Sequence, residues 1–320
     1  MSGPEARREA AGSVDAQHLP VLAAETVERL APERGGLFVD ATVGLGGHAE
    51  ALLARAPAVR LLGLDRDAEA LARAARRLSV FGDRVSFEQA NFHHLEKVLS
   101  RLGIRSVSGV LADLGVSSLQ LDTAERGFSF RFDGPLDMRM GLAERTAADV
   151  VNQSSEGDLE KILRDYGEER QARRIARAIV RERAREPFRT TGQLKRVVDQ
   201  AKGGSGREGR IDAATRVFQA LRIEVNEELA GLQGFVEQTV RLLESDGRLV
   251  VISYHSLEDR IVKNTLRDLA RGEIDEVTGR PRAESQLIEV LTRKPVRPSE
   301  EEVAFNPRSR SARLRAARRL

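Results

Sequence analysis

The sequence predicts an α/β fold, a mostly parallel sheet whose chain is interrupted by a small helical domain. Between Gly35 and Asp113, short apolar runs alternate with amphipathic helical patterns. Strands separated by helices in this way form parallel sheets through right-handed crossovers. The alternation stops for about a hundred residues and resumes at Gly247, so the helical stretch between them is predicted to be an insertion.

The first half of the chain contains four candidate buried strands, at residues 36–41, 59–65, 85–90 and 107–113. Each is a short run rich in Val, Leu or Phe, which is typical of a strand covered on both faces. Helical patterns follow the first three strands, at residues 48–56, 68–81 and 93–103. We therefore expect the carboxyl ends of these strands to lie along one edge of the sheet.

The second half predicts more helices than strands. Helical patterns cover residues 170–186, 190–203 and 256–270, and one long helix is expected over 213–245. The candidate strands are 247–253, 288–292 and 311–317. The predicted organisation is a disordered N-terminus at 1–17, an α/β domain formed by 18–136 and 208–320, and a helical insert at 137–207.

Composition excludes several classes of protein. The chain has 320 residues, 41% hydrophobic and 32% charged, so it can bury a full core. No apolar run reaches the ~18 residues that span a bilayer, and the first residues lack the apolar core of a secretion signal. The absence of cysteine excludes disulfides, thiolate metal sites and a cysteine nucleophile. We expect a soluble protein with no membrane partner, in the cytoplasm by default.

A glycine-rich turn follows the first predicted strand. Gly44, Gly46 and Gly47 lie between Asp40 and the next helix. Glycine tolerates positive φ and lets a ligand approach the backbone, while the start of a helix offers free N–H groups to an anion. The spacing Gly44-x-Gly46-x-x-Ala49 fits one form of the dinucleotide-binding pattern.

Asp65 strengthens the prediction of a nucleoside-containing cofactor. It ends the second strand, nineteen residues after Gly46, where a carboxylate can accept both hydroxyls of a ribose. Phe92, after the third strand, is placed either to flank an adenine or to join the core. The cofactor is a nicotinamide dinucleotide or S-adenosylmethionine, and the second is favoured because the later half of the sheet brings no second nucleotide-binding unit.

Polar residues also end two later strands. Asp113 ends one, and Ser253 and His255 lie at the end of another, so all three are catalytic candidates at one crevice. Asp113 is placed to stabilise a cation, orient an amine or take its proton, or else simply to cap a turn. Ser253 and His255 lie along one turn, which argues against a hydrolase triad. Ser256 and Asp259 predict a capping box for the next helix.

Two arginine-rich stretches are candidate RNA-binding surfaces. One is the helix at 170–186, with Arg173, Arg174 and Arg177. The other is the C-terminal segment, with Arg308, Arg310, Arg313 and Arg315 and no acid after Glu302. Such cations either contact phosphates or form helical ion pairs and a solvated basic terminus. No metal site is predicted, because His48, His93 and His94 lack the spacing of zinc ligands.

Seven motifs together resemble the RsmH (MraW) family. They are HLPVLAAE (18–25), DATVGLGGHAE (40–50), DLGVSSLQLDTAERGFSFRFDGPLDMRM (113–140), YGEERQARRIARAIV (166–180), ATRVFQALRIEVNEEL (214–229), VISYHSLEDRIVK (251–263) and NPRSRSARLRA (306–316). The resemblance implies a Rossmann-like class I S-adenosylmethionine-dependent methyltransferase with an inserted helical domain. It also implies that the target is the N4 amine of a cytidine in the decoding centre of bacterial 16S rRNA.

By this resemblance, Gly46, Gly47 and His48 line the methionine end of the cofactor, Asp65 binds the ribose and Phe92 the adenine. Asp113 and Gln120 complete the pocket. The expected partner is 16S rRNA in the small ribosomal subunit, and a homodimer stays open. Tyr254 departs from the family, in which Phe is usual.

Two other functions stay open at this point. A nicotinamide-dependent oxidoreductase would use the same glycine-rich turn. A non-catalytic RNA-binding factor for ribosome assembly would keep the pocket without transferring a methyl group.

Overall fold

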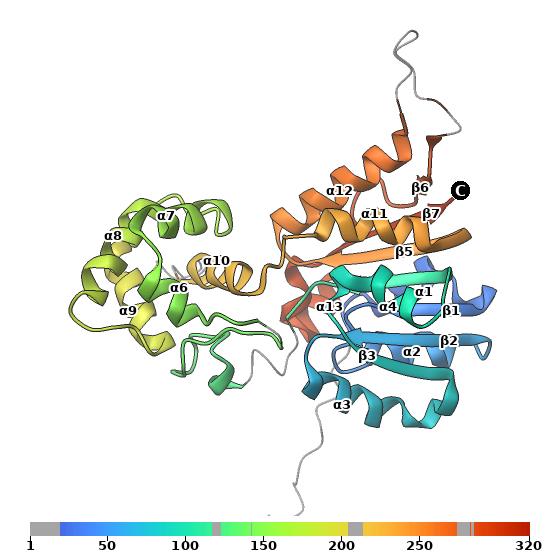
Figure 1. The fold of residues 1–320 in the computed structure, drawn as a ribbon, viewed down its shortest axis with the longest axis horizontal. Helices are drawn as coiled ribbons and strands as arrows, with labels where there is room; N and C mark the ends of the chain where they lie inside the picture. The colour runs from blue at the N-terminus through green and yellow to red at the C-terminus, as the bar shows by residue number, and fades with distance from the viewer. Residues whose placement is uncertain (1–19, 117–122, 142, 204–213, 274–281, 283–284) are drawn as a thin grey trace, which may run out of the picture.

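The computed structural model describes residues 20–116, 123–141, 143–203, 214–273, 282 and 285–320. Figure 1 shows a unit built on a twisted sheet and, beside it, a separate helical unit that α10 joins to the sheet. The predicted disordered segment 1–17 lies outside the described residues.

The sheet has seven strands in the order β3-β2-β1-β4-β5-β7-β6. Their bounds are Gly36–Asp40 (β1), Val59–Asp65 (β2), Val85–Gln89 (β3), Val107–Asp113 (β4), Leu243–Ser253 (β5), Ile288–Val290 (β6) and Arg313–Arg319 (β7). The first five strands are parallel, and β7 is antiparallel to both of its neighbours. This confirms the predicted α/β class. The strand order reverses between β1 and β4, which is where such sheets bind ligands.

Helices cover both faces of the sheet, and each face has its own apolar core. One core contains side chains of α1 (Ala23–Leu30), α2 (Gly47–Arg55) and α3 (Ala68–Arg77). The other contains side chains of α4 (Leu95–Arg101), α11 (Leu232–Leu242) and α12 (Ser256–Arg271). Neighbouring strand residues alternate between the two, as Val250 and Val251 do, because side chains of a strand point to opposite faces.

Short helical segments occupy several connections. They are η2 (Pro32–Arg34), η3 (Leu78–Arg84), η4 (Phe92–His94), η5 (Ala124–Arg126), α13 (Glu300–Phe305) and η7 (Pro307–Ser311). Within the described ranges, none of the helices has both the length and the apolar surface that a membrane span requires.

The helical unit has a third core of its own. Its helices are α6 (Ala147–Gln153), α7 (Glu156–Asp165), α8 (Ala172–Arg183), α9 (Thr191–Lys202) and α10 (Thr215–Asn226). This core extends from Phe128 to Val225 and includes buried residues of α10. The predicted insert at 137–207 is therefore narrower than the unit that packs together, since residues on both sides of it share one core.

The single long helix predicted over 213–245 is wrong. The chain forms α10 and α11 instead, because Glu227 (φ 50°) and Gly231 (φ 75°) adopt left-handed backbone conformations between them. The break lets α10 join the helical unit and α11 cover the sheet. The apolar residues of 213–245 are therefore divided between two cores.

Candidate active site

A pocket opens at the carboxyl ends of the central strands. Its wall contains Gly47, His48, Asp65, Phe92 and Asp113, which are five of the predicted site residues. They come from the ends of β2 and β4 and from the segments after β1 and β3, so residues far apart in the sequence meet at the switch in strand order. Gln120 lies outside the described residues.

The glycine-rich turn between β1 and α2 forms one side of the pocket. Gly44 and Gly46 have φ of 51° and 82°, a region that L side chains rarely adopt. Gly46 precedes α2 and packs closely against Leu78. A Cβ on Gly46 would lie only 3.2 Å from the Leu78 side chain. Gly47 lines the pocket, and a Cβ on it would approach Pro20 at 3.2 Å.

Asp65 is held in place by the backbone. Its carboxylate accepts the N–H of Gly44 at 2.9 Å through Oδ2 and the N–H of Asp67 at 2.9 Å through Oδ1. Burial raises the pKa of Asp65, and these two donors act in the opposite direction. Each oxygen keeps a second lone pair, so the carboxylate can still accept ribose hydroxyls.

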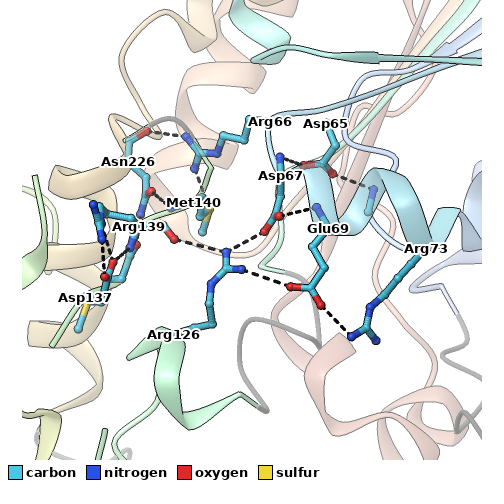
Figure 2. A network of polar contacts seen from close by, with 12 residues as sticks. Asp65, Arg66, Asp67, Glu69, Arg73, Arg126, Asp137, Arg139, Met140 and Asn226 are labelled. Carbon is cyan, nitrogen blue, oxygen red and sulfur yellow. Dashed lines mark hydrogen bonds and ion pairs between the residues drawn. The ribbon is translucent and has the colours of Figure 1, made fainter. Parts of the chain in front are cut away.

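A polar network joins the turn after β2 to the helical unit (Figure 2). Arg126 donates to the Asp67 carboxylate at 2.7 Å. Arg66 donates to the carbonyl of Asn226 at 3.1 Å, and the Asn226 side chain accepts the N–H of Met140 at 2.8 Å. The turn after β2, which borders the pocket, is therefore connected to the helical unit by hydrogen bonds and an ion pair.

Asp113 lies beside His48, with 3.5 Å between Oδ2 and Nε2. Both ring nitrogens of His48 are buried and lack a hydrogen-bond partner among the described residues. A buried imidazole with unused nitrogens suits a pocket that receives a polar ligand, because unpaired buried polar atoms are costly. Next to them, burial raises the pKa of Asp40 to about 7.

The structure does not bring Ser253 and His255 into the pocket wall. The Ser253 hydroxyl donates to the Arg313 carbonyl at 3.4 Å, between β5 and β7. His255 precedes α12 and forms its capping box with Glu258, which corrects the predicted Ser256–Asp259 box by one residue. Tyr254 lies in the wall instead, and burial, followed by the charge of Asp113, raises its pKa well above the ordinary value.

Phe92 lies between the pocket and the core, and its predicted contact with an adenine stays a prediction. It lines the pocket, and its ring also packs edge-on against Phe235 of α11 with 4.9 Å between centroids. Phe92 therefore packs against the core and also borders the pocket.

The predicted RNA-binding arginines separate into two groups. Arg173, Arg174 and Arg177 line a groove between α8 and α9, away from the cofactor residues. Arg308 lines the cofactor pocket itself, and Arg310 is exposed.

Arg315 lies in the strand predicted over 311–317, and its contacts argue against the RNA-binding role predicted for it. It lies within β7, is 6% exposed, and binds the Asp259 carboxylate at 2.6 Å and 3.2 Å. Arg313 lies 3.9 Å from the same carboxylate. The Arg315 guanidinium is therefore not available to contact RNA, because it binds Asp259 inside the fold.

One cluster has ligand atoms in an arrangement that can hold a metal ion. Glu228, His255 and Glu258 offer ligand atoms within 4.8 Å of one another. Glu228 is already paired with Arg222 at 2.8 Å, and a cation at this point would be repelled by that guanidinium. The prediction of no metal site stays a prediction.

Comparisons with known proteins show the family of the chain. Residues 15–320 match the model of the MraW methylase family. The ribosomal RNA small subunit methyltransferase H of Geotalea uraniireducens is 51% identical over 311 residues, covering 96% of this chain and 99% of the relative. The protein of the same name from Thermobifida fusca is 49% identical over 321 residues, covering 99% and 97%. A solved rRNA methylase from Streptococcus thermophilus matches at a TM-score of 0.39 and 12% identity, covering 93% of each chain. The chain therefore belongs to the MraW methylase family.

Proposed function

We propose that this protein transfers a methyl group from S-adenosylmethionine to the N4 amine of a cytidine in 16S rRNA. The observation that carries the proposal is the convergence of Asp65, His48 and Asp113 in one pocket at the switch between β1 and β4. The family membership, and the rRNA methyltransferase names of relatives at about half identity, support the same reaction.

Within the pocket, the predicted cofactor residues take distinct roles. Asp65 accepts the ribose hydroxyls and Phe92 borders the adenine. Gly47 and His48 border the methionine end, where the two free nitrogens of His48 can meet its polar groups. Gly46 acts indirectly, by shaping the turn. The chemistry of these side chains also fits S-adenosylmethionine, because a carboxylate or an imidazole nitrogen can accept hydrogen bonds from its hydroxyl and amine groups.

Bound S-adenosylmethionine would supply a methyl group on a positive sulfur. That sulfur would keep the electron pair of the broken S–C bond, while the amine nitrogen would bond to the methyl carbon and lose a proton. Asp113 supplies a carboxylate for the cationic centre and for the amine N–H. Its own backbone N–H donates to Thr42 Oγ1 at 2.7 Å, which fixes the end of β4. Most of the acceleration comes from holding nitrogen, carbon and sulfur in line.

The RNA is bound by an arginine groove on the helical unit and by Arg308 in the pocket wall. Arg173 and Arg174 are exposed on α8, and the groove that they share with Arg177 is rich in positive charge. Such cations bind the phosphate backbone and fix its register without reading its sequence. Arg308, in the pocket wall, is assigned to the nucleotides that flank the target. We propose the small ribosomal subunit, in the cytoplasm, as the assembled substrate.

Labelled methyl transfer tests the proposal. Small subunits from a strain lacking the enzyme are incubated with the protein and labelled S-adenosylmethionine, and the RNA is digested for nucleoside analysis. We expect the label in N4-methylated cytidine. Label in another nucleoside would contradict the target, and no transfer would favour the non-catalytic alternative. Calorimetry with NADH against S-adenosylhomocysteine tests the oxidoreductase alternative, which requires NADH to bind.

A further inference from the structure

The pocket has a second wall that no predicted site residue accounts for. It is formed by Arg222, Asn226 and Glu228 at the end of α10 and by Tyr254 and Glu258 at the junction of β5 and α12. The ring of Tyr254 joins this wall to Asp113. A Cβ on Gly115 would lie 2.7 Å from that ring, and the Gly115 N–H donates to Asp113 at 3.4 Å. The wall therefore adjoins the carboxylate at which we propose methyl transfer.

Arg222 and Glu228 form a forked ion pair in this wall. Nε donates to Oε1 at 2.8 Å and Nη2 donates to Oε2 at 2.8 Å, with side-chain exposures of 17% and 10%. Burial acts to lower the pKa of Arg222, but the charge and hydrogen bond of Glu228, together with the charge of Glu258, raise it overall, so the guanidinium stays charged. Within the described part of the chain, Nη1 of Arg222 makes no hydrogen bond. The pair therefore keeps free donors and lone pairs at the pocket surface.

The neighbouring polar groups are already committed. Glu258 accepts the backbone N–H groups of Tyr254 and His255 at 2.9 Å and 3.3 Å, which completes the start of α12. The Asn226 side chain binds the N–H of Met140 and the carbonyl of Met138, at 2.8 Å and 2.7 Å. These two residues build the wall, while the ion pair retains capacity for a ligand.

We propose that Arg222 and Glu228 bind the Watson–Crick edge of the target cytosine, with Glu228 accepting from the N4 amine and Arg222 donating to N3 and O2. The inference rests on the proposed function. Cytosine presents one donor and two acceptors on this edge, which complements a carboxylate beside a guanidinium. Uracil would place its O4 acceptor against the carboxylate and leave buried polar groups unpaired, so the pair discriminates between the two pyrimidines.

The same arrangement prepares the amine for reaction. The N4 amine has two N–H groups, and Glu228 and Asp113 provide one carboxylate for each. An amine held by two acceptors has a fixed nitrogen and a ready route for the proton that it loses. Glu228 and Arg222 thus act as specificity-determining residues beside the catalytic carboxylate.

Glu228→Gln tests the inference, with Glu227→Gln as the matched control. Gln keeps the shape and one acceptor but removes the charge, and Glu227 is the neighbour outside the pocket wall. Single-turnover methyl transfer to the subunits is measured at saturating S-adenosylmethionine. We expect the rate to fall about 10- to 100-fold in Glu228→Gln, the scale for a lost charge-assisted hydrogen bond, and to be unchanged in Glu227→Gln. Affinity for S-adenosylhomocysteine is expected to stay within about twofold in both.

Inhibition by free nucleotides tests base recognition directly, because a purely structural role of Glu228 would not change the preference for one base. Cytidine 5′-monophosphate should inhibit the wild-type protein more strongly than uridine 5′-monophosphate, and Glu228→Gln should lose this preference. A normal rate in Glu228→Gln, a preserved preference, or no preference in the wild type would overturn the inference. Weakened affinity of Glu228→Gln for S-adenosylhomocysteine would also overturn the inference, because it would indicate that Arg222 and Glu228 contact the cofactor. Failure of the wild type to methylate cytidine would instead reject the proposed function.

Discussion

Arg126 binds the carboxylate of Asp67 at 2.7 Å and so connects the chain entering the helical unit to the turn that follows Asp65. The Asp67 side chain is only 8% exposed and Arg126 is 24% exposed, so this ion pair is largely shielded from water. The second oxygen of Asp67 is used locally, since Oδ1 accepts the N–H of Glu69 at 3.1 Å at the start of α3. The ion pair therefore links the helical unit to the turn that holds Asp65, the residue that we propose binds the ribose.

Arg126→Ala is expected to weaken S-adenosylhomocysteine binding by about 1–2 kcal/mol, because it removes the cation that neutralises the shielded Asp67 carboxylate beside Asp65. Calorimetric titration measures the change. Arg139→Ala is the control: Arg139 is 42% exposed and pairs with Asp137 on the helical side of the network. If Arg126→Ala bound S-adenosylhomocysteine as tightly as Arg139→Ala, the Arg126–Asp67 ion pair would not contribute to cofactor binding.

Asp113→Asn is expected to lower the single-turnover rate about 100-fold or more while the protein stays folded. Asn keeps the size of the side chain but cannot stabilise a cation or accept a proton. The rate is measured at saturating S-adenosylmethionine, since the same carboxylate borders the cofactor. A cofactor-saturated variant with a near-normal rate would reduce Asp113 to a residue that ends β4.

Charge reversal of Arg173 and Arg174 is expected to weaken RNA binding. The slope of log affinity against log salt should become shallower by about one for each phosphate that the protein no longer neutralises. Cofactor affinity should not change, because the groove lies apart from the cofactor residues. Filter binding over a salt series gives the slope. Reversal of Arg76, an exposed arginine on α3, controls for net charge, and an equal effect there would indicate attraction without a defined site.

Arg315→Ala is expected to cost about 3–5 kcal/mol of unfolding free energy, because it leaves the Asp259 carboxylate shielded from water without its main partner. Denaturant unfolding measures this change. Arg310→Ala, at an exposed position, should change stability by less than about 0.5 kcal/mol. If Arg315→Ala were as stable as the wild type, the ion pair between β7 and α12 would not support the fold.

Asp40 predicts a pH dependence of stability. Its pKa is about 7 in the folded protein, against 3.8 as its ordinary value, because burial disfavours the charged form. Between these values the folded state holds a proton that the unfolded state has released, so this group makes stability fall as pH rises from about 4 to about 7. Asp40→Asn should remove that part of the decline, and unfolding curves at about pH 5 and about pH 8 test it. An unchanged slope would assign the dependence to other groups.

Strand positions were readable from the sequence because buried parallel strands are short apolar runs with sharp ends. The strands predicted at 59–65 and 107–113 have those bounds in the structure. Asp65 and Asp113 were predicted for the same reason: a carboxylate that ends an apolar run lies at the sheet edge where ligands bind.

The break between α10 and α11 was not readable, because apolar periodicity continues through Glu227, which has no turn signature of its own. Gly231 was the one local signal. The Arg222–Glu228 pair follows from that break, since two residues on opposite sides of it meet only after the chain turns. The C-terminal segment was predicted both as a strand over 311–317 and as a basic surface. β7 confirms the strand, whose residues Leu314 and Ala316 lie in the core.

β7 is made after all the other strands, yet it lies inside the sheet, between β5 and β6. During synthesis, β5 therefore exposes a full hydrogen-bonding edge until residues 313–319 emerge and fill it. Open strand edges of this kind attract other chains and promote aggregation. A truncated protein that lacks residues 313–319 would thus be less soluble. Its soluble yield would measure how much the pairing of β7 with β5 protects the protein from aggregation.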